Sequence, residues 1–424
     1  MKKKVCISIV GSIVLITLFI ILRLIIIDHS QKVYIEDFVD EEMGELIILN
    51  AKADARLKKD KIIKEVKIEN VENIDELNIG YTGYYTTLAD IKKCKNLNML
   101  AIGEPLLGLI NCLNPTDEIP EPENAEKIKQ IEEELGEILT SCSKLEKLYI
   151  WNTEETCNLS SLNFLKKNNS IKWLSINDMG DIDYSPILTC TSLDSLDLDG
   201  CNISELGDIS KLTNLELLSI ENTNISDLGG ISKLTNLKHL HIDGTNISEL
   251  GEIGKLTNLE TLTMDDTNIS ELGDISKLTN LKELSMNDTN ISELGDISKL
   301  TNLTRLNISG TNISELGDIS KLTNLEYLSM NNTNISDLGE IGKLTNLYRL
   351  KISGCNISDL GEICKLTNLK YLDISGTNIS EWGDIVNLKN LETLIIKNTP
   401  LAEDEEQIML LYKTLPNIIE IDRF

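Results

Sequence analysis

Two of the three histidines in the chain, His239 and His241, are separated by a single residue. Side chains two residues apart on a β-strand point to the same face, so this spacing would place both imidazoles on one side of a sheet. Neutral imidazole is a common metal ligand. The equivalent positions 22 residues before and after the pair offer no further strong ligand, and they hold Leu217, Ser219, Thr261 and Thr263. We therefore predict no metal site at the two histidines.

Carboxylates form a second group with possible chemistry, and they are Asp243, Asp265, Asp266 and Asp288. Several oxygen ligands in a row suit Ca²⁺. A solvated acidic edge has the same composition and needs no ion. We favour the acidic edge and predict no bound metal here either.

Enzyme motifs are absent from the sequence, which contains no GxSxG, HExxH or P-loop pattern. No cysteine has a histidine placed beside it for nucleophilic work. We accordingly predict that the protein is not an enzyme, with neither catalytic residues nor a cofactor.

Arginine, lysine and tyrosine gather at a third group of positions, which are Arg305, Tyr327, Arg349, Lys351 and Tyr371. Arginine and tyrosine are typical anchors of binding interfaces. Because the formal net charge of the chain is −28, a basic and aromatic group favours a ligand with an acidic or hydrogen-bonding surface. We predict a ligand-binding face that comprises these residues with His239, His241, Glu283 and Asp373. The alternative is that exposed positions vary because packing does not restrain them.

The candidate residues recur because the chain repeats every 22 residues. The twelve-residue segment SELGDISKLTNL occurs four times, starting at Ser204, Ser270, Ser292 and Ser314. If the unit is numbered from Leu215, its third to seventh residues alternate inward and outward, which predicts a strand. The rest of the unit carries apolar residues at every third position and a glycine at position fifteen. This pattern predicts a tight turn and a short 3₁₀ or helical return, so that successive units stack as a solenoid.

The unit fits L-x-x-L-x-L-x-x-(N/C/T)-x-I and resembles the leucine-rich repeat, most closely the bacterial internalin type, from Ile171 to Leu401. The resemblance implies an α/β leucine-rich repeat solenoid, with a curved parallel sheet on the concave face and 3₁₀ or helical returns on the convex face. It also implies an asparagine ladder at position nine. That position holds threonine, or Cys201 and Cys355, which we expect to fill the same inner role. The predicted binding residues vary on the concave face, whereas the convex returns are nearly identical.

Irregular repeats are predicted over residues 74–170, with a loop and helix inserted at 111–143. Ile128, Ile131, Leu135 and Ile138 share one face of that helix, which we expect on the return side as a brace, with a docking element as the alternative. Residues 31–73 and 402–424 read as the caps that a solenoid requires. The second cap contains a helix from Glu403 to Leu415, with Ile408, Leu410, Leu411 and Leu415 on its apolar face, and a final strand.

The first residues predict a membrane anchor. Residues 1–4 would be a cytoplasmic tail, and residues 5–27 supply the roughly 20 apolar residues that a spanning helix needs. Lys2, Lys3 and Lys4 place the N-terminus in the cytoplasm and the repeats outside the cell. A cleaved signal peptide is the alternative, although its apolar region should be shorter. The immunoglobulin-like modules and wall-sorting motif of many internalins do not appear before Phe424, so we expect attachment to rest on this helix.

Charge and cysteine content narrow the function further. The excess of acidic residues, 68 against 40 basic ones, disfavours nucleic acid as a partner. A disulfide among Cys94, Cys112, Cys142, Cys157 and Cys190 is left open, because the nine cysteines show no CxxC pair. We predict a membrane-anchored extracellular protein that recognises a protein, peptide or glycan on its concave face. The alternative is a non-catalytic scaffold or accessory subunit of a membrane complex.

Overall fold

The computed structural model describes residues 32–51, 65–103, 125–151, 159–168 and 170–423, which fall into two compact units, Met1–Ile171 and Lys172–Phe424. The predicted cytoplasmic tail and membrane anchor, residues 1–4 and 5–27, lie outside the described residues. Among the residues that are described, no helix has the length and apolar character needed to cross a membrane.

The first unit begins with an antiparallel pair, β1 (Lys32–Tyr34) and β2 (Glu65–Lys67). Helix α2 (Glu41–Asn50) starts where the Asp40 side chain accepts a hydrogen bond from the Met43 amide at 2.7 Å. Its apolar residues Leu46, Ile47 and Ile48 are buried. The other elements of this part are η1 (Ile35–Asp37), α3 (Ile68–Glu72) and η2 (Thr82–Tyr84).

Three parallel strands follow in the first unit, β3 (Glu76–Asn78), β4 (Met99–Ile102) and β5 (Lys147–Trp151). Helix α4 (Ala125–Ser141) lies in the predicted insertion and packs against the 3₁₀ turns η3 (Ala89–Lys93) and η4 (Asn163–Lys167). Its Ile131, Leu135 and Ile138 are buried, as expected, whereas Ile128 is half-buried. Glu134 of α4 accepts the Leu88 amide at 2.7 Å, so this helix braces the return side.

The strands of the second unit pair in parallel, each with its sequence neighbour. They are β6 (Trp173–Asn177), β7 (Ser195–Asp197), β8 (Leu217–Ser219), β9 (His239–His241), β10 (Thr261–Thr263), β11 (Glu283–Ser285), β12 (Arg305–Asn307), β13 (Tyr327–Ser329), β14 (Arg349–Lys351), β15 (Tyr371–Asp373), β16 (Thr393–Ile395) and β17 (Glu420–Asp422). Leu218, Leu240 and Leu262 lie side by side in this register. The predicted stacking of 22-residue coils is thereby confirmed.

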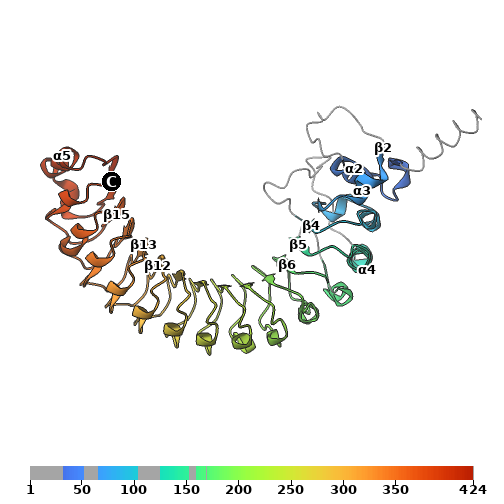
Figure 1. Ribbon diagram of the computed structural model, residues 1–424, viewed down its shortest axis with the longest axis horizontal. Coiled ribbons are helices and arrows are strands. Elements are labelled where there is room, and N and C mark those ends of the chain that lie inside the picture. Colours follow the sequence, from blue (N-terminus) through green and yellow to red (C-terminus); the bar gives the residue numbers. More distant parts are fainter. Residues whose placement is uncertain (1–31, 52–64, 104–124, 152–158, 169, 424) are drawn as a thin grey trace, which may run out of the picture. The chain divides into compact units, whose positions relative to one another are not determined.

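The returns of the second unit are single 3₁₀ turns. They are η5 (Ser185–Thr189), η6 (Ile209–Lys211), η7 (Gly229–Lys233), η8 (Ile253–Lys255), η9 (Ile275–Lys277), η10 (Ile297–Lys299), η11 (Ile319–Lys321), η12 (Ile341–Lys343), η13 (Gly361–Lys365), η14 (Ile385–Asn387) and η15 (Pro400–Glu403). Within this unit the strands line the inner side of the arc and the turns line the outer side (Figure 1). The leucines and isoleucines between the two layers are almost completely buried.

Two positions of each coil have left-handed backbone. The predicted glycine at position fifteen has positive φ, as at Gly251 (53°) and Gly339 (54°). Position eight, directly after the strand segment, also has positive φ throughout the regular coils, and it holds only glycine, asparagine or aspartate. These are the residue types that tolerate this conformation. Asp266 and Asp288 occupy position eight, so backbone geometry explains their residue type.

The asparagine ladder lies at a different position from the one that the resemblance implies. Threonine at position nine bonds within its own coil, as where Thr223 Oγ1 donates to the Ile220 carbonyl at 2.8 Å. The asparagine that ends each unit instead reaches the preceding coil, and Asn258 Nδ2 donates to the Thr235 carbonyl at 2.8 Å. The same bond recurs from Asn214 to Asn390. Threonine at position nine therefore closes the turn of its own coil by a hydrogen bond, and the final asparagine connects neighbouring coils by another.

The described cysteines Cys94, Cys142, Cys201, Cys355 and Cys364 are free and buried, and Cys190 is also buried. Cys112 and Cys157, which belong to the open disulfide prediction, lie outside the described residues. Cys355 Sγ lies 3.0 Å from the Met330 carbonyl of the preceding coil, which supports the packing role predicted for position nine. Burial raises the pKa of Cys201 to about 11, so this thiol stays protonated and unreactive at neutral pH.

The C-terminal cap consists of α5 (Glu405–Thr414) and β17, which pairs with β16. Ile408, Leu411 and Leu415 are buried against the last coil. Leu410, which was predicted on the same apolar face, is 48% exposed. The prediction was wrong for this residue because the buried face follows the spacing 408, 411 and 415, and position 410 lies outside that stripe.

Candidate binding face

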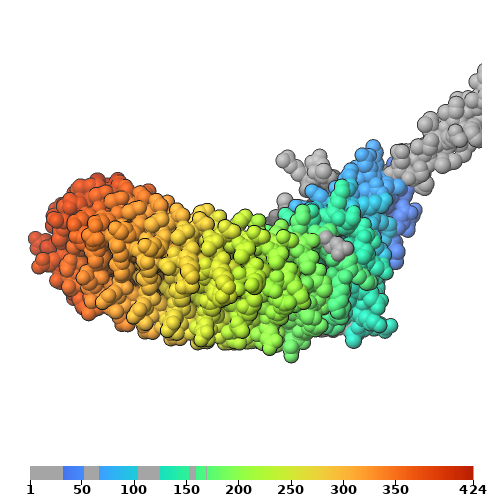
Figure 2. Space-filling model, turned by 60° about the horizontal axis from the view of Figure 1, so that its bottom comes forward, coloured from blue at the N-terminus to red at the C-terminus, as the bar shows by residue number. Residues whose placement is uncertain are grey.

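Side chains at positions three and five of each coil point away from the core on the strand side. The paired strands place these residues in columns, since Arg305 faces Tyr327, Tyr327 faces Arg349, and Arg349 faces Tyr371. On the outer side of the second unit, successive coils repeat the same relief (Figure 2). In the sequence, the residues of the outer returns are nearly identical between coils whereas positions three and five vary, so chemical variety in this unit is concentrated on the inner face.

Arginine and tyrosine alternate along the position-three column and stack on one another. The guanidinium of Arg305 lies 5.0 Å from the Tyr327 ring centroid, and that of Arg349 lies 4.1 Å from the Tyr371 ring centroid. Lys351 Nζ is 6.0 Å from the same Tyr371 ring. Cation–π contacts at such distances hold long side chains in one arrangement. We call Arg305, Tyr327, Arg349 and Tyr371 the Arg–Tyr ladder.

The two ends of the Arg–Tyr ladder differ in how their charges are satisfied. Arg305 Nε forms an ion pair with Glu283 at 3.2 Å, and both side chains are largely exposed. Arg349 Nε is buried and has no hydrogen-bond partner. Asp373, at the far end, accepts hydrogen bonds from the Ser375 amide and hydroxyl at 3.0 and 2.7 Å. The ladder thus keeps an unsatisfied donor near its centre.

His239 and His241 point to the inner face, as predicted, and each contacts a threonine of the next strand. His239 Nδ1 lies 3.1 Å from Thr261 Oγ1, and His241 Nδ1 lies 3.1 Å from Thr263 Oγ1. Burial lowers the pKa of His241 despite the acidic side chains nearby. The two imidazoles have different surroundings, because His241 lies within 3.9 Å of Glu221 Oε1 and joins a cluster with Glu221 and Asp243 that does not include His239.

The predicted row of Asp243, Asp265, Asp266 and Asp288 is two sets with different roles. Asp266 and Asp288 are exposed at position eight. Asp243 and Asp265 lie at position seven, and each accepts a hydrogen bond from the position-seven amide of the next coil. The Asp265 amide donates to Asp243 at 2.5 Å, and the Asn287 amide donates to Asp265 at 2.6 Å. The prediction of a single solvated edge was therefore wrong for the position-seven residues, because they bridge adjacent coils.

Position seven holds carboxylates in four successive coils, which are Asp199, Glu221, Asp243 and Asp265. Burial and the neighbouring carboxylates raise the pKa of Glu221 to about 7, and burial raises that of Asp199 to about 6. The residues on the inner face of the same coils include no lysine or arginine at positions three, five or seven. The residues of this acidic column lie two positions after the ends of β7 to β10, whereas the residues of the Arg–Tyr ladder lie on β12 to β15.

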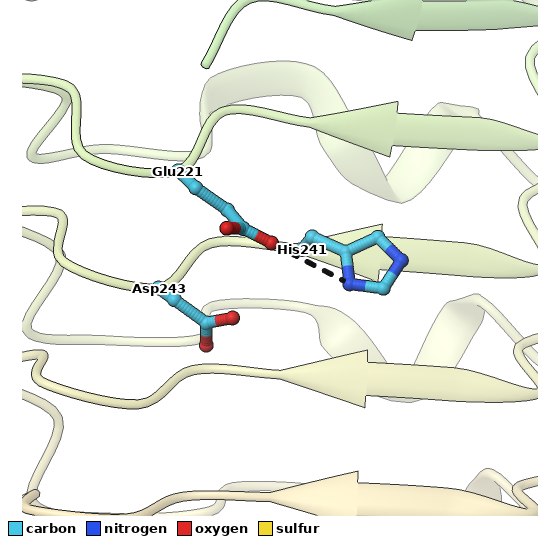
Figure 3. Close-up of side chains that lie close together, drawn as sticks. All are labelled: Glu221, His241 and Asp243. Carbon is cyan, nitrogen blue, oxygen red and sulfur yellow. Dashed lines mark ion pairs between the residues drawn. The ribbon is translucent and has the colours of Figure 1, made fainter. Parts of the chain in front are cut away.

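Glu221, His241 and Asp243 come together within the acidic column (Figure 3). One ligand atom from each lies within 4.8 Å of the others, and Glu221 Oε1 is 3.9 Å from His241 Nδ1. The further ligands that seemed absent at the histidines are two carboxylates at position seven of two coils, and they join His241 but not His239. Sequence reasoning compared the histidines only with positions three and five. A comparison of position seven across repeats would have shown Glu221 and Asp243.

Comparison with known proteins agrees with this geometry. Residues 174–314 match a family model described as a leucine-rich repeat region, and residues 323–365 match one described as leucine-rich repeats in two copies. No curated protein matches the chain.

Solved structures share the fold at low sequence identity. Internalin InlF from Listeria monocytogenes is 21% identical with a TM-score of 0.61, over 92% of this chain and 96% of that protein. A leucine-rich repeat protein from Leptospira interrogans is 22% identical with a TM-score of 0.61, over 84% and 97%. The functional domain of InlJ from Listeria monocytogenes, which includes a cysteine ladder, is 19% identical with a TM-score of 0.61, over 87% and 76%.

Proposed function

Since the chain is a leucine-rich repeat protein similar to the bacterial internalins, we propose that it binds a partner protein through the Arg–Tyr ladder. The observation that carries this proposal is the alternation of Arg305, Tyr327, Arg349 and Tyr371 on four neighbouring strands. Arginine and tyrosine supply much of the binding energy in protein interfaces. Their mutual stacking lowers the entropy that they lose when a partner binds.

The partner surface is acidic or rich in hydrogen-bond acceptors. Arg305, Arg349 and Lys351 lie within reach of one bound segment, and the buried Nε of Arg349 lacks an acceptor. Because this nitrogen has almost no accessible surface, a carboxylate or carbonyl of a partner would supply the acceptor once the half-buried Arg349 side chain turns toward it. Glu283 pairs with Arg305 at the margin, where an approaching acidic group would compete with it.

The cellular setting in our proposal is the outer surface of a membrane. The apolar run of residues 5–27 would anchor the chain, and the preceding lysines would keep its start in the cytoplasm. Protease added to whole cells should then degrade the repeats without lysis. Protection of the repeats until the cells are lysed would place them inside.

The binding proposal is tested by affinity capture with the full chain and a fourfold alanine variant of Arg305, Tyr327, Arg349 and Tyr371. The matched control replaces four outer lysines, which are Lys277, Lys299, Lys321 and Lys343. We expect the ladder variant to bind the captured protein roughly thirtyfold more weakly or worse. The control should retain wild-type affinity.

Equal affinity of the wild type and the ladder variant, with circular dichroism unchanged, would refute this use of the inner face. Loss of the partner in the outer-lysine variant alone would instead support the alternative of a scaffold that acts through its convex face. The absence of enzymatic activity stays a prediction from the sequence.

A further inference from the structure

We propose that Glu221, His241 and Asp243 form a binding site for a first-row divalent metal ion of the Zn²⁺ class. The three residues come from adjacent coils, with His241 on β9 and the carboxylates two residues past β8 and β9 (Figure 3). This site lies outside the Arg–Tyr ladder, and it does not rest on the binding function proposed above.

The distances are close to those that a bound ion requires. Ligand atoms about 2.1 Å from a tetrahedral Zn²⁺ lie roughly 3.4 Å from one another. Glu221 Oε1 and His241 Nδ1 are 3.9 Å apart, and all three ligand atoms lie within 4.8 Å of one another. Side-chain rotations would close the remaining gap, because all three side chains are half-buried rather than locked in the core.

Glu221 departs from the structural role of its column. The Asp199, Asp243 and Asp265 side chains each accept the backbone amide of the next position seven, at 2.8, 2.5 and 2.6 Å. Glu221 has one more methylene group, and its carboxylate is turned toward His241 (Figure 3). The column therefore supplies one carboxylate that approaches the imidazole at the place where a histidine follows.

Neighbouring groups orient the Asp243 ligand. The Asp265 amide donates to Asp243 Oδ1 at 2.5 Å, and the Thr263 hydroxyl donates to Asp243 Oδ2 at 2.7 Å, which leaves a further lone pair on each oxygen. Partners of this kind fix ligand geometry in metal sites. Thr263 Oγ1 also lies 3.1 Å from His241 Nδ1, and because its only proton goes to Asp243, Nδ1 is the donor in that contact. A bound ion would replace this contact and require the neutral tautomer with its proton on Nε2, so that Nδ1 presents a lone pair.

The ligand set selects the class of ion. An imidazole nitrogen beside two carboxylates suits Zn²⁺ and its first-row neighbours, whereas Ca²⁺ and Mg²⁺ prefer oxygen ligands alone. The negative charge of Asp199, Glu221, Asp243 and Asp265 has no lysine or arginine beside it at positions three, five or seven of these coils. Three protein ligands would leave one position of a tetrahedral ion for water or for a group on a partner.

The test measures Zn²⁺ binding to the full chain by isothermal titration calorimetry at neutral pH, after treatment with a chelator. We expect one saturable site whose affinity falls at least tenfold in Glu221→Gln and in His241→Asn. The matched control is His239→Asn, which removes the other imidazole of the same strand and should stay within about twofold of wild type.

Substitution with Co²⁺ provides a second readout that separates this site from the cysteines. We expect the weak visible bands of nitrogen and oxygen ligation, without a strong thiolate charge-transfer band, and their loss in His241→Asn. The proposal is overturned by the absence of a stoichiometric site, by equal binding in His241→Asn and wild type, or by an equal loss in His239→Asn.

Discussion

The inner face of the second unit carries two opposite chemistries on one backbone. Strands β7 to β10 are followed by the acidic column of Asp199, Glu221, Asp243 and Asp265. Strands β12 to β15 carry the Arg–Tyr ladder. Both halves use the same 22-residue coil, the same buried leucines and the same left-handed turn residues.

This difference shows that the residues that hold the coils together and the residues that set the chemistry of the inner face occupy different positions of the repeat. Positions one, four and six are buried in each half, and substitutions there are felt by every neighbouring coil. Positions three and five face outward, so their charge can reverse within a few strands without altering the stack. Position seven can also change its charge, but its side chain accepts an amide of the next coil in both halves, as Asp243 and Asn331 do, so it must keep an acceptor. The two halves should then respond alike to changes in the framework and differently to changes on the face.

The largest effect is expected from buried leucines. Leu240→Ala in the acidic half and Leu350→Ala in the basic half should each lower the free energy of unfolding by about 2–5 kcal/mol, because both side chains are fully buried. Chemical denaturation measures both losses. A large loss at one position and none at the other would break the idea of a common framework.

A smaller effect is expected at the turn glycines. Gly251→Ala and Gly339→Ala should each cost about 1–2 kcal/mol, because an L-residue is strained at positive φ. An added Cβ meets no atom within 4 Å at either glycine, so steric overlap does not contribute. The matched Gly→Asn variants are the control, measured by thermal unfolding. Because asparagine tolerates positive φ, they should lose much less stability than the alanine variants. Alanine variants as stable as wild type would contradict the strain.

The smallest effect is expected from pH, and only in the acidic half. Because the pKa of Glu221 is raised to about 7 in the folded chain, folding is favoured while this group is protonated. Its contribution is complete below pH 4.5, the ordinary glutamate value, and is lost as pH rises through 7. Glu221→Gln should therefore be more stable than wild type at pH 8, with a difference that shrinks on acidification.

Denaturation in the presence of a chelator, at a series of pH values, measures this difference. The comparison variant is Asn331→Asp in the basic half, which places a carboxylate at position seven between Ser309 and Ser353. Without acidic neighbours in that column, we expect a weaker dependence on pH. A difference between Glu221→Gln and wild type that is constant across the range would exclude the proposed cause.

The framework could be predicted because each coil must fit the next one. Repetition of leucine at positions one and four specified the register that places Leu218 beside Leu240 and Leu262. Glycine at position fifteen indicated a turn, and the turn is present. The Arg–Tyr ladder could be predicted as a column, although its stacking depends on rotamers that sequence does not report.

The acidic cluster could not be predicted from residues that are close in sequence. Asp265 and Asp266 are adjacent in the chain, yet one bridges two coils and the other fits a left-handed turn. Glu221 and His241 are 20 residues apart and meet because coils stack. The final asparagine ladder was missed for the same reason, since contacts between coils follow columns rather than segments.

Because each strand of the second unit pairs with its sequence neighbour, side chains on the inner face are placed in discrete steps from coil to coil. Each step is about 4.8 Å, the spacing of paired strands. Removal or duplication of one complete coil between β10 and β12 would shift the acidic column relative to the Arg–Tyr ladder by that single step. The distance between the two chemistries is thus set by an integer, the number of coils between them.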